Sequence, residues 1–215
     1  MAKLQNLTDA VVKGDADKIK LLILELLNDG RDAHQIMHDG LIAGMNIVGE
    51  KMEKEEMFIP EVLMSARAMS GGVEMLKAQL TEDEEEASGK FIVGTVQGDL
   101  HDIGKNLLKM LMEGSGFTVI DLGTDVAPSA FVDAVKEHDA GILGMSALLT
   151  TPMPKMKETI EALEEAGLRD KVKVMVGGAP VTEAYAEEIG ADAYGYDAGA
   201  AVRIAKQFQA DEETA

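Results

Sequence analysis

The stretch GTVQGDLHDIGKN, residues 94–106, places an imidazole between two carboxylates in a glycine-containing segment. His101 lies two residues after Asp99 and one residue before Asp102. An imidazole beside a carboxylate can act as a general base or bind a metal ion. Alternatively, one of the aspartates caps a helix and the histidine is incidental. The spacing by itself leaves these three interpretations open.

The residues around His101 narrow the chemistry. The loop holds no serine or cysteine nucleophile, and the chain has no cysteine at all, which excludes disulfides and thiolate metal sites. The phosphate-binding patterns GxGxxG and GxxxxGK[ST] are both absent. The other histidines, His34, His38 and His138, fall in helical runs, so this loop alone lacks the ligands of a zinc site. A single histidine is still sufficient for a metal that brings its own macrocycle.

The second half of the chain alternates between strand and helix patterns. The strand-like runs are FIVGTV (91–96), TVIDLG (118–123), AGILGMS (140–146), KVKVMVGG (171–178) and ADAYGY (191–196). The helical runs are 105–114, 128–137, 152–166, 181–189 and 198–208. This alternation predicts an α/β doubly wound (Rossmann/flavodoxin-like) fold with a five-stranded parallel sheet. Ligands bind beyond the carboxyl ends of such strands, and His101 lies in the first loop there.

The first 80 residues carry apolar residues at helical spacing and no alternating strand pattern. The helical runs are 4–12, 18–30, 32–57 and 59–80, which predicts an N-terminal four-helix bundle. The acidic stretch TEDEEEASGK then interrupts the pattern and is typical of a solvated linker. We therefore expect a helical bundle at 1–82, an acidic linker at 83–89 and a sheet domain at 90–215.

Composition excludes several classes of partner. The formal net charge of the 215 residues is −19, which would repel nucleic acid and anionic membranes. The chain lacks tryptophan and is 4% aromatic, so base stacking on aromatic platforms is not expected either. No signal peptide or membrane-spanning segment is evident in the sequence. We expect a cytoplasmic protein that binds neither nucleic acid nor a membrane.

Three short motifs together resemble a known family. Asp99-Leu100-His101-Asp102-Ile103-Gly104 matches the D-x-H-x-x-G signature of corrinoid (vitamin B12) binding domains. Ser146-Ala147-Leu148 matches the S-x-L motif and Gly177-Gly178 matches the G-G motif, each at a predicted strand end. For Ser146 and the two glycines, ordinary turn chemistry is the alternative. With its helical half, the chain resembles the bundle-plus-B12-domain module of methionine synthase and the small corrinoid methyl-carrier proteins of methyltransferase systems.

The resemblance implies a set of site residues. His101 would be the lower axial ligand of cobalt, and Asp99 would hydrogen-bond its distal nitrogen. The implied cofactor-binding residues are Gly98, Asp99, Leu100, His101, Asp102, Ile103, Gly104, Ser146, Leu148, Thr150, Gly177, Gly178, Ala198, Met52 and Ile59. Met52 and Ile59 would cap the upper cobalt face, although core packing is the alternative for both. Pro152 stands where methionine synthase continues its His–Asp relay to a serine, so either Thr150 or Thr151 substitutes or the relay stops at Asp99.

The resemblance also implies a function. The chain would bind cobalamin or a related corrinoid, methylcobalamin in the loaded state, and carry a methyl group on cobalt. A substrate-specific methyltransferase would load it, and a second methyltransferase would pass the group to tetrahydrofolate or a thiol. A reductive activation protein is a further expected partner, and the chain would not turn over alone. The alternatives are a B12-binding isomerase subunit and a B12-based sensor. Methanol, methylamines, betaines and aryl methyl ethers all stay open as donors.

Overall fold

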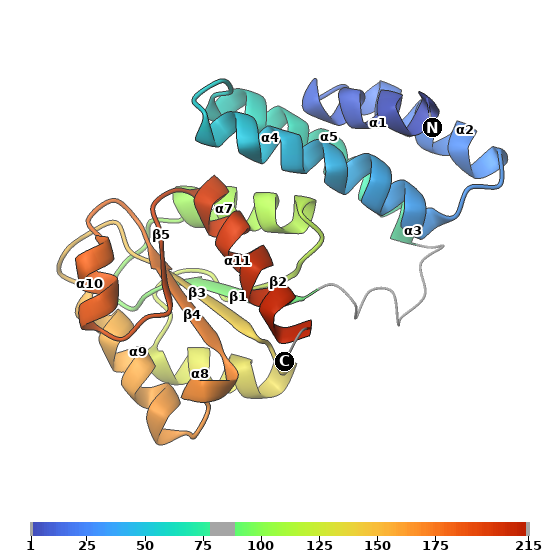
Figure 1. Ribbon diagram of the computed structural model, residues 1–215. Coiled ribbons are helices and arrows are strands. Elements are labelled where there is room, and N and C mark those ends of the chain that lie inside the picture. Colours follow the sequence, from blue (N-terminus) through green and yellow to red (C-terminus); the bar gives the residue numbers. More distant parts are fainter. Residues whose placement is uncertain (1, 78–88, 214–215) are drawn as a thin grey trace. The chain divides into compact units, whose positions relative to one another are not determined.

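The computed structural model describes residues 2–77 and 89–213, which form two compact units. The first unit comprises residues 1–88 with 110–117, and the second comprises residues 89–109 with 118–215. Figure 1 shows the helices of the first and the sheet of the second. Apart from Gly89, the predicted acidic linker lies outside the described residues. No helix in the described ranges is both long and apolar enough to cross a membrane.

The first unit is built from helices alone within the described residues. Its elements up to residue 77 are α1 (Ala2–Val12), α2 (Ala16–Asn28), α3 (Ala33–Ile36), the π-helical η1 (Met37–Ile42), α4 (Ala43–Glu53) and α5 (Ile59–Lys77). The last residues of α7 (Ile103–Gly114) also belong to this unit. Asp15 and Asp32 cap α2 and α3 by accepting the N–H groups of Lys18 and Gln35. Because α3, η1 and α4 follow one another without a break, the unit is the four-helix bundle that the sequence predicted.

The third helix of the bundle contains a π-helical segment that the sequence pattern did not predict. α1 passes close to it, since a Cβ on Gly40 would lie 2.5 Å from Leu7 Cδ2 and one on Gly44 would lie 2.6 Å from Val11 Cβ. The buried hydroxyl of Thr8 donates to the carbonyl of Gly40 at 3.2 Å. The two glycines therefore allow the close approach, and Thr8 satisfies a carbonyl in the irregular turn.

The second unit alternates strands and helices as predicted. Its elements are β1 (Lys90–Thr95), α7 (Ile103–Gly114), β2 (Thr118–Asp121), α8 (Pro128–His138), β3 (Ile142–Ser146), α9 (Pro154–Glu165), η2 (Arg169–Lys171), β4 (Lys173–Gly177), α10 (Glu183–Glu188), β5 (Ala193–Gly195) and α11 (Ala198–Glu213). α9 begins two residues later than expected. Pro152 is buried in the turn before it, where Met153 N–H donates to the carbonyl of Thr150 at 3.3 Å.

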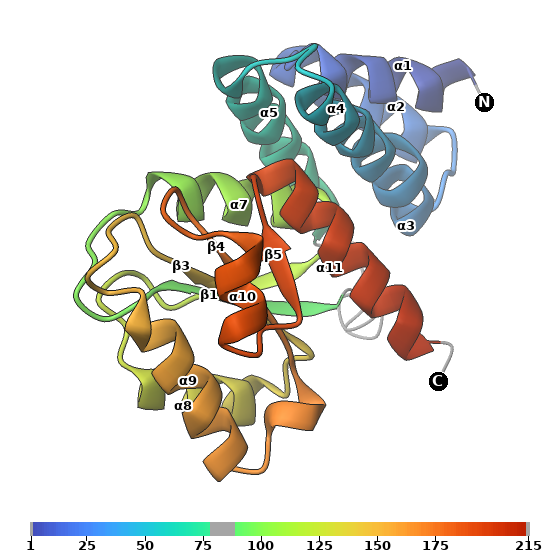
Figure 2. The same ribbon diagram turned by 60° about the vertical axis from the view of Figure 1, so that its left-hand side comes forward.

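The five strands form one parallel sheet in the order β2-β1-β3-β4-β5, the flavodoxin-like order. Figure 1 and Figure 2 show α7 and α11 on one face of the sheet and α8 and α9 on the other. The core on the α8 and α9 side includes Ile92, Phe131, Leu143, Met156 and Val176. The strand order reverses between β1 and β3, so the loops after these two strands flank the position where such sheets bind ligands.

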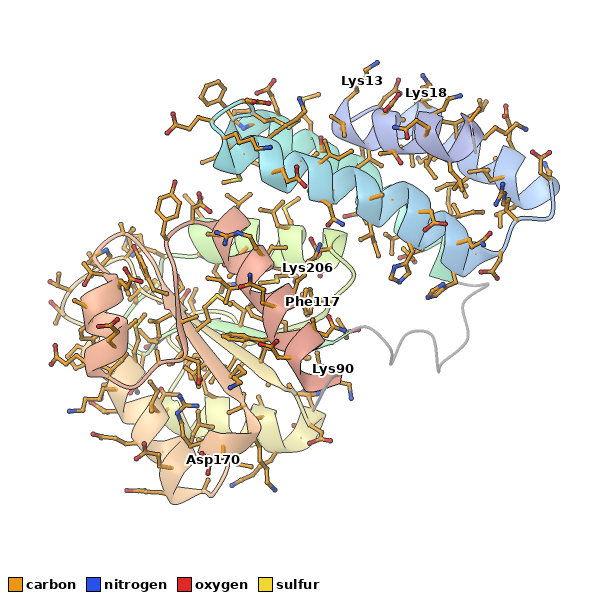
Figure 3. The ribbon with its side chains drawn as sticks, viewed as in Figure 1. Lys13, Lys18, Lys90, Phe117, Asp170 and Lys206 are labelled. Carbon is orange, nitrogen blue, oxygen red and sulfur yellow. The ribbon has the colours of Figure 1, made fainter. Side chains whose placement is uncertain are left out.

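Because all five strands are parallel, the loops that follow them lie together at one end of the sheet, the end formed by the carboxyl ends of the strands. Thr95 at the end of β1 pairs with Ser146 at the end of β3, and Gly177 of β4 pairs with Gly195 of β5. Lys90 begins β1 and Asp170 shortly precedes β4, so these two residues mark the opposite edge in Figure 3. The predicted motifs therefore come together through the fold although they lie far apart in the sequence.

Candidate functional site

His101 and Asp99 form a hydrogen-bonded pair in the loop after β1. His101 Nδ1 lies 2.7 Å from Asp99 Oδ1, and a carboxylate can only accept, so Nδ1 carries the hydrogen. The Asp99 side chain is fully buried, whereas that of His101 is 51% exposed. Because Nδ1 is engaged, the lone pair of Nε2 remains available to a ligand outside the protein.

Four donors converge on the Asp99 carboxylate. Oδ1 accepts the ring and the backbone N–H of His101, and Oδ2 accepts the backbone N–H groups of Leu148 at 2.7 Å and Leu149 at 3.1 Å. Burial alone would raise the pKa of Asp99, but these hydrogen bonds outweigh it and lower the pKa to about 2. Asp99 is therefore a fixed anion that joins the loop after β1 to the loop after β3.

Two further contacts brace the loop that carries His101. The buried Thr95 hydroxyl donates to the carbonyl of His101 at 2.9 Å. The N–H of Gly98 donates to Asp125 Oδ1 at 2.7 Å, and Gly98 has a φ of 89°, a conformation that favours glycine. His101 is thus held by a hydrogen bond to its ring and by one to its backbone carbonyl, and a third hydrogen bond fixes the start of its loop at Gly98.

The glycines of the motifs serve two different purposes. A Cβ on Gly178 would lie 1.9 Å from the carbonyl oxygen of Ala147, and one on Gly177 would lie 2.8 Å from that of Gly195. The protein's own backbone therefore occupies the space beside both residues. A Cβ on Gly104 would have no atom within 4 Å, so Gly104 leaves open space next to the His101 loop.

Large apolar side chains are exposed at the end of the sheet where His101 lies. Those on the strand-end loops and the start of α7 are Leu100 (74% exposed), Ile103 (85%), Leu148 (45%), Leu149 (48%) and Tyr196 (66%). An apolar surface of this kind beside a free ring nitrogen is suited to a large, flat, mostly apolar ligand. We call these five residues the apolar rim.

The remaining predicted residues lie on several elements. Ser146 ends β3 and is partly buried, and its carbonyl accepts the N–H of Val96 at 3.0 Å. Thr150 is exposed in the loop after β3, and Ala198 begins α11. The Asp102 carboxylate accepts the side-chain amide of Asn106 at 3.0 Å.

The two predicted cap residues lie in the helical unit. Met52 is partly buried near the end of α4, and Ile59, the first residue of α5, is 52% exposed. Phe58, directly before it, is 67% exposed. Exposure of these apolar side chains at a helix start is unlike ordinary core packing.

The sequence pattern missed several residues that build the site. Leu149 acts through its backbone N–H, for which no side-chain signal exists. Thr95 and Asp125 are polar residues at strand ends, which the pattern did not distinguish from other turn residues. Lys105 is buried on α7, three and seven residues before Leu108 and Met112. A lysine on the helix face that also carries Leu108 and Met112 is unusual, and the sequence pattern could have identified it.

The donor set at this edge fits a metal that arrives in a macrocycle. In residues 2–77 and 89–213, no group of three or more His, Cys, Asp or Glu side chains could hold a metal ion. His101 offers one nitrogen, Asp99 orients it, and the apolar rim and Gly104 leave room for a bulky partner. This is the arrangement that a corrinoid needs from a protein that supplies its lower ligand.

Comparison with protein families agrees with this chemistry. Residues 89–205 match the model of the B12 binding domain, and residues 3–77 match a second B12 binding domain model. The chain belongs to the B12-binding domain family. Its cofactor is a corrinoid, as the three motifs indicated, and it has both the helical bundle and the sheet domain that the periodicity predicted.

Known relatives of this B12-binding protein cover nearly its whole length. It is 42% identical over 211 residues to a corrinoid protein of Desulfitobacterium hafniense, covering 97% of this chain and 98% of the relative. It is 44% identical over 208 residues to dimethylamine corrinoid protein 1 of Methanosarcina acetivorans, covering 96% and 97%. In the crystal structure of the methanol:cobalamin methyltransferase complex MtaBC from Methanosarcina barkeri, a chain 30% identical superposes with a TM-score of 0.86, covering 97% of this chain and 80% of that one.

Proposed function

We propose that this B12-binding protein is a methyl carrier that serves two methyltransferases and uses His101 as the lower cobalt ligand. When bound, the corrinoid would supply the chemistry, since its cobalt can accept a methyl group from one enzyme and release it to another. The observation that carries the proposal is the His101–Asp99 pair, in which Nδ1 is bonded at 2.7 Å and Nε2 is left for a ligand.

Each part of the site has a role in this proposal. Asp99 fixes the ring orientation and, as an anion, increases the basicity of Nε2. The apolar rim would contact the corrin ring, and Gly104 would allow backbone to approach the cofactor. Ser146, Thr150 and Ala198 would line the path of the nucleotide tail, as the family resemblance implies.

The proposed methyl donor is a methylated amine. Support comes from the dimethylamine corrinoid protein, which is similar over 96% of this chain. The loading partner would then be an amine-specific methyltransferase, and the unloading partner a methyltransferase acting on a thiol or on tetrahydrofolate. A reductive activation protein would return the cobalt to the state that accepts a methyl group.

The helical bundle is proposed to shield the cofactor. Met52 and Ile59 would cover the upper cobalt face, and the exposed, apolar character of Ile59 and Phe58 supports this. The proposed parts of the chain are the bundle at 1–82, the acidic linker at 83–89 and the cobalamin-binding domain at 90–215. Replacing Ile59 with Ser should speed the reaction of bound corrinoid with small oxidants without changing its lower ligand.

The test of the ligand is the His101→Ala variant, reconstituted with cobalamin. The side chain is half exposed, so the variant should fold like the wild type. Its absorption spectrum should show a corrinoid without a protein nitrogen ligand. His138→Ala is the matched control, because it removes an imidazole from the end of α8, outside the strand-end loops. A spectrum of His101→Ala identical to that of the wild type would refute the ligand assignment.

A second experiment tests the donor. The reconstituted carrier is incubated with separately purified methyltransferases specific for methylamines or for methanol, together with their substrates. Methylation of the corrinoid, followed by its absorption, should require an amine-specific enzyme. Methylation with the methanol enzyme alone would contradict the proposed donor while leaving the role of His101 intact.

A further inference from the structure

A buried lysine lies one turn away from His101 and has no part in the proposed function so far. Lys105, in the first turn of α7, has a side chain that is 2% exposed. Its Nζ donates to Asp121 Oδ1 at 2.6 Å and to Asn106 Oδ1 at 2.8 Å. Asp121 is the last residue of β2, so the ion pair ties the start of α7 to the edge of the sheet.

The contacts of Lys105 continue towards the histidine loop. Asn106 Nδ2 donates to Asp102 Oδ2 at 3.0 Å, and the backbone N–H of Asn106 donates to the carbonyl of Asp102 at 2.7 Å. Asp102 directly follows His101 in the chain. A continuous series of hydrogen bonds therefore runs from Asp121 through Lys105 and Asn106 to the residue next to the imidazole.

The other end of the series is also anchored. Asp121 Oδ1 accepts the N–H of Gly123 at 2.9 Å, and Oδ2 accepts Lys109 Nζ at 3.4 Å. Burial of Asp121 would raise its pKa, but hydrogen bonds from Lys105 and Gly123 and the charges of Lys105 and Lys109 together lower it, so the Asp121 carboxylate is ionised near neutral pH. The carbonyl of Gly123 in turn accepts the N–H of Thr95, whose hydroxyl holds the carbonyl of His101.

A buried ion pair contributes little net free energy to the stability of a helix. Desolvation of the ammonium offsets much of the attraction, and an apolar side chain would suit the face shared with Leu108 and Met112. An apolar side chain, however, makes no directional hydrogen bonds and so could not fix the positions of Asn106 and Asp121. The geometry at Lys105 therefore points to a positional role.

We propose that Lys105 is a positioning residue that fixes the His101 imidazole for its ligand by holding Asp102 through Asn106. The inference rests on the proposed role of His101 as the cobalt ligand. His101 is then held on both sides, by Asp99 on its ring and by the Lys105 series on the residue that follows it. Loss of the second anchor leaves the ring bonded to Asp99 but frees the loop to turn, so Nε2 spends less time in its binding position.

Three variants test this in the full-length protein. Lys105→Met removes the ammonium and keeps an unbranched side chain of similar length. Asn106→Ala breaks the series between Lys105 and Asp102 and leaves the buried ion pair in place. Lys109→Met is the matched control, because it removes the other lysine on Asp121, at 3.4 Å and 35% exposed, which lies outside the series that joins Lys105, Asn106 and Asp102.

The first readout is the electron paramagnetic resonance spectrum of the Co(II) form reconstituted with cobalamin. Nitrogen superhyperfine splitting reports the fraction of cobalt bound to His101. The ratio of histidine-bound to histidine-free cobalt should fall about tenfold in Lys105→Met and in Asn106→Ala, the usual effect of removing a residue that orients a metal ligand. Lys109→Met should keep the wild-type ratio. A wild-type ratio in a folded Asn106→Ala would overturn the inference, whether or not Lys105→Met folds.

The second readout separates this inference from the proposed function. In the protein without corrinoid, nitrogen-15 relaxation of the His101 and Asp102 backbone amides should show larger motion in Asn106→Ala than in Lys109→Met. Equal order parameters in the two variants would overturn the inference. A wild type that binds cobalamin without nitrogen splitting would instead contradict the role of His101 and leave the relaxation result standing.

Discussion

At the scale of single residues, the site depends on how Asp99 is satisfied. Each of its two oxygens already accepts two donors, from His101 and from the backbone of Leu148 and Leu149. A carboxylate has about four lone-pair positions, so a further hydroxyl partner would have to displace one of these donors. The backbone N–H groups of Leu148 and Leu149 therefore occupy the positions on Oδ2 that a side-chain hydroxyl would otherwise use.

The first prediction concerns the stability of the protein without cofactor. Asp99→Asn should lower the free energy of unfolding by about 2 kcal/mol at neutral pH, because an amide cannot accept all four hydrogen bonds. The pKa of Asp99 is about 2 when folded, below its ordinary 3.8, so its contribution is complete above about pH 4 and is lost as the pH falls towards 2.

Denaturant titrations of the wild type and Asp99→Asn at several pH values measure this difference. The gap between the two proteins should narrow steadily as the pH is lowered from 4 to about 2. A gap that widens on acidification, or that is absent at neutral pH, would mean that the four hydrogen bonds do not favour the charged form of Asp99.

The second prediction compares Pro152 with Asp99. If the relay ends at Asp99, Pro152→Ser should alter the pH dependence of the corrinoid reduction potential only slightly, because Asp99 has no free acceptor position. Asp99→Asn should alter it strongly, since the imidazole loses its charged partner. Spectroelectrochemical titration of both variants between about pH 6 and 8 decides the point. The larger effect in Pro152→Ser would show that Thr150 or Thr151 takes part.

At the scale of elements, the sequence predicted the alternating sheet domain and the helical bundle because both rest on periodicity. Runs such as FIVGTV and KVKVMVGG bury both faces of a strand, and that pattern survives in the structure as β1 and β4. The π-helical turn at Met37–Ile42 was not predictable in this way. It lies where Gly40 and Gly44 let α1 approach closely, and these contacts join residues distant in sequence and leave the apolar spacing unchanged.

The site was predictable to the same degree. The motifs that contain His101, Ser146 and Gly178 mark strand ends, and the parallel topology brings strand ends together. Contacts made by backbone atoms, such as those of Leu148 and Leu149 with Asp99, leave no trace in residue type. The sequence also did not show why position 178 holds a glycine, because the group that leaves no room for a side chain is the carbonyl of Ala147.

The third prediction separates the two kinds of glycine. Gly178→Ala should destabilise the cofactor-free protein by about 2 kcal/mol or more, because φ is 117° and a Cβ would meet the Ala147 carbonyl at 1.9 Å. Gly104→Ala should instead stabilise it by about 0.5–1 kcal/mol, because the site is helical and open.

Although Gly104→Ala should stabilise the cofactor-free protein, it should weaken the binding of the corrinoid. The added methyl group would fill space proposed for the cofactor, so Gly104→Ala should bind cobalamin more weakly despite its higher melting temperature. Calorimetric melting and cobalamin titration of the same preparation provide both values. Unchanged cobalamin affinity would show that the open space beside Gly104 does not face the cofactor.

At the scale of the whole molecule, the charge distribution defines what kind of partner can dock. The chain has 39 acidic and 20 basic residues. The strand-end segments 96–102, 122–127, 147–153, 178–182 and 196–197 contain four aspartates and neither lysine nor arginine. Asp99 is a buried anion whose oxygens are taken up by internal hydrogen bonds, whereas Asp102 and Asp125 are exposed. The edge of the sheet that would bear the cofactor is therefore apolar at the rim and anionic around it.

The last prediction follows from the negative charge around the apolar rim. We expect a methyltransferase that docks here to present a basic, partly apolar surface, and attraction between the two proteins would raise the association rate. With the carrier limiting, the rate of methyl transfer should fall about tenfold or more as salt is raised from about 50 mM to 500 mM, because the screening length shortens. The absorption spectrum of the bound corrinoid should stay unchanged over this range. Asp125→Asn, which keeps an oxygen acceptor for Gly98 N–H, should reduce the salt dependence, whereas Asp133→Asn on α8 should not. A rate independent of salt would show that docking depends on the apolar rim alone.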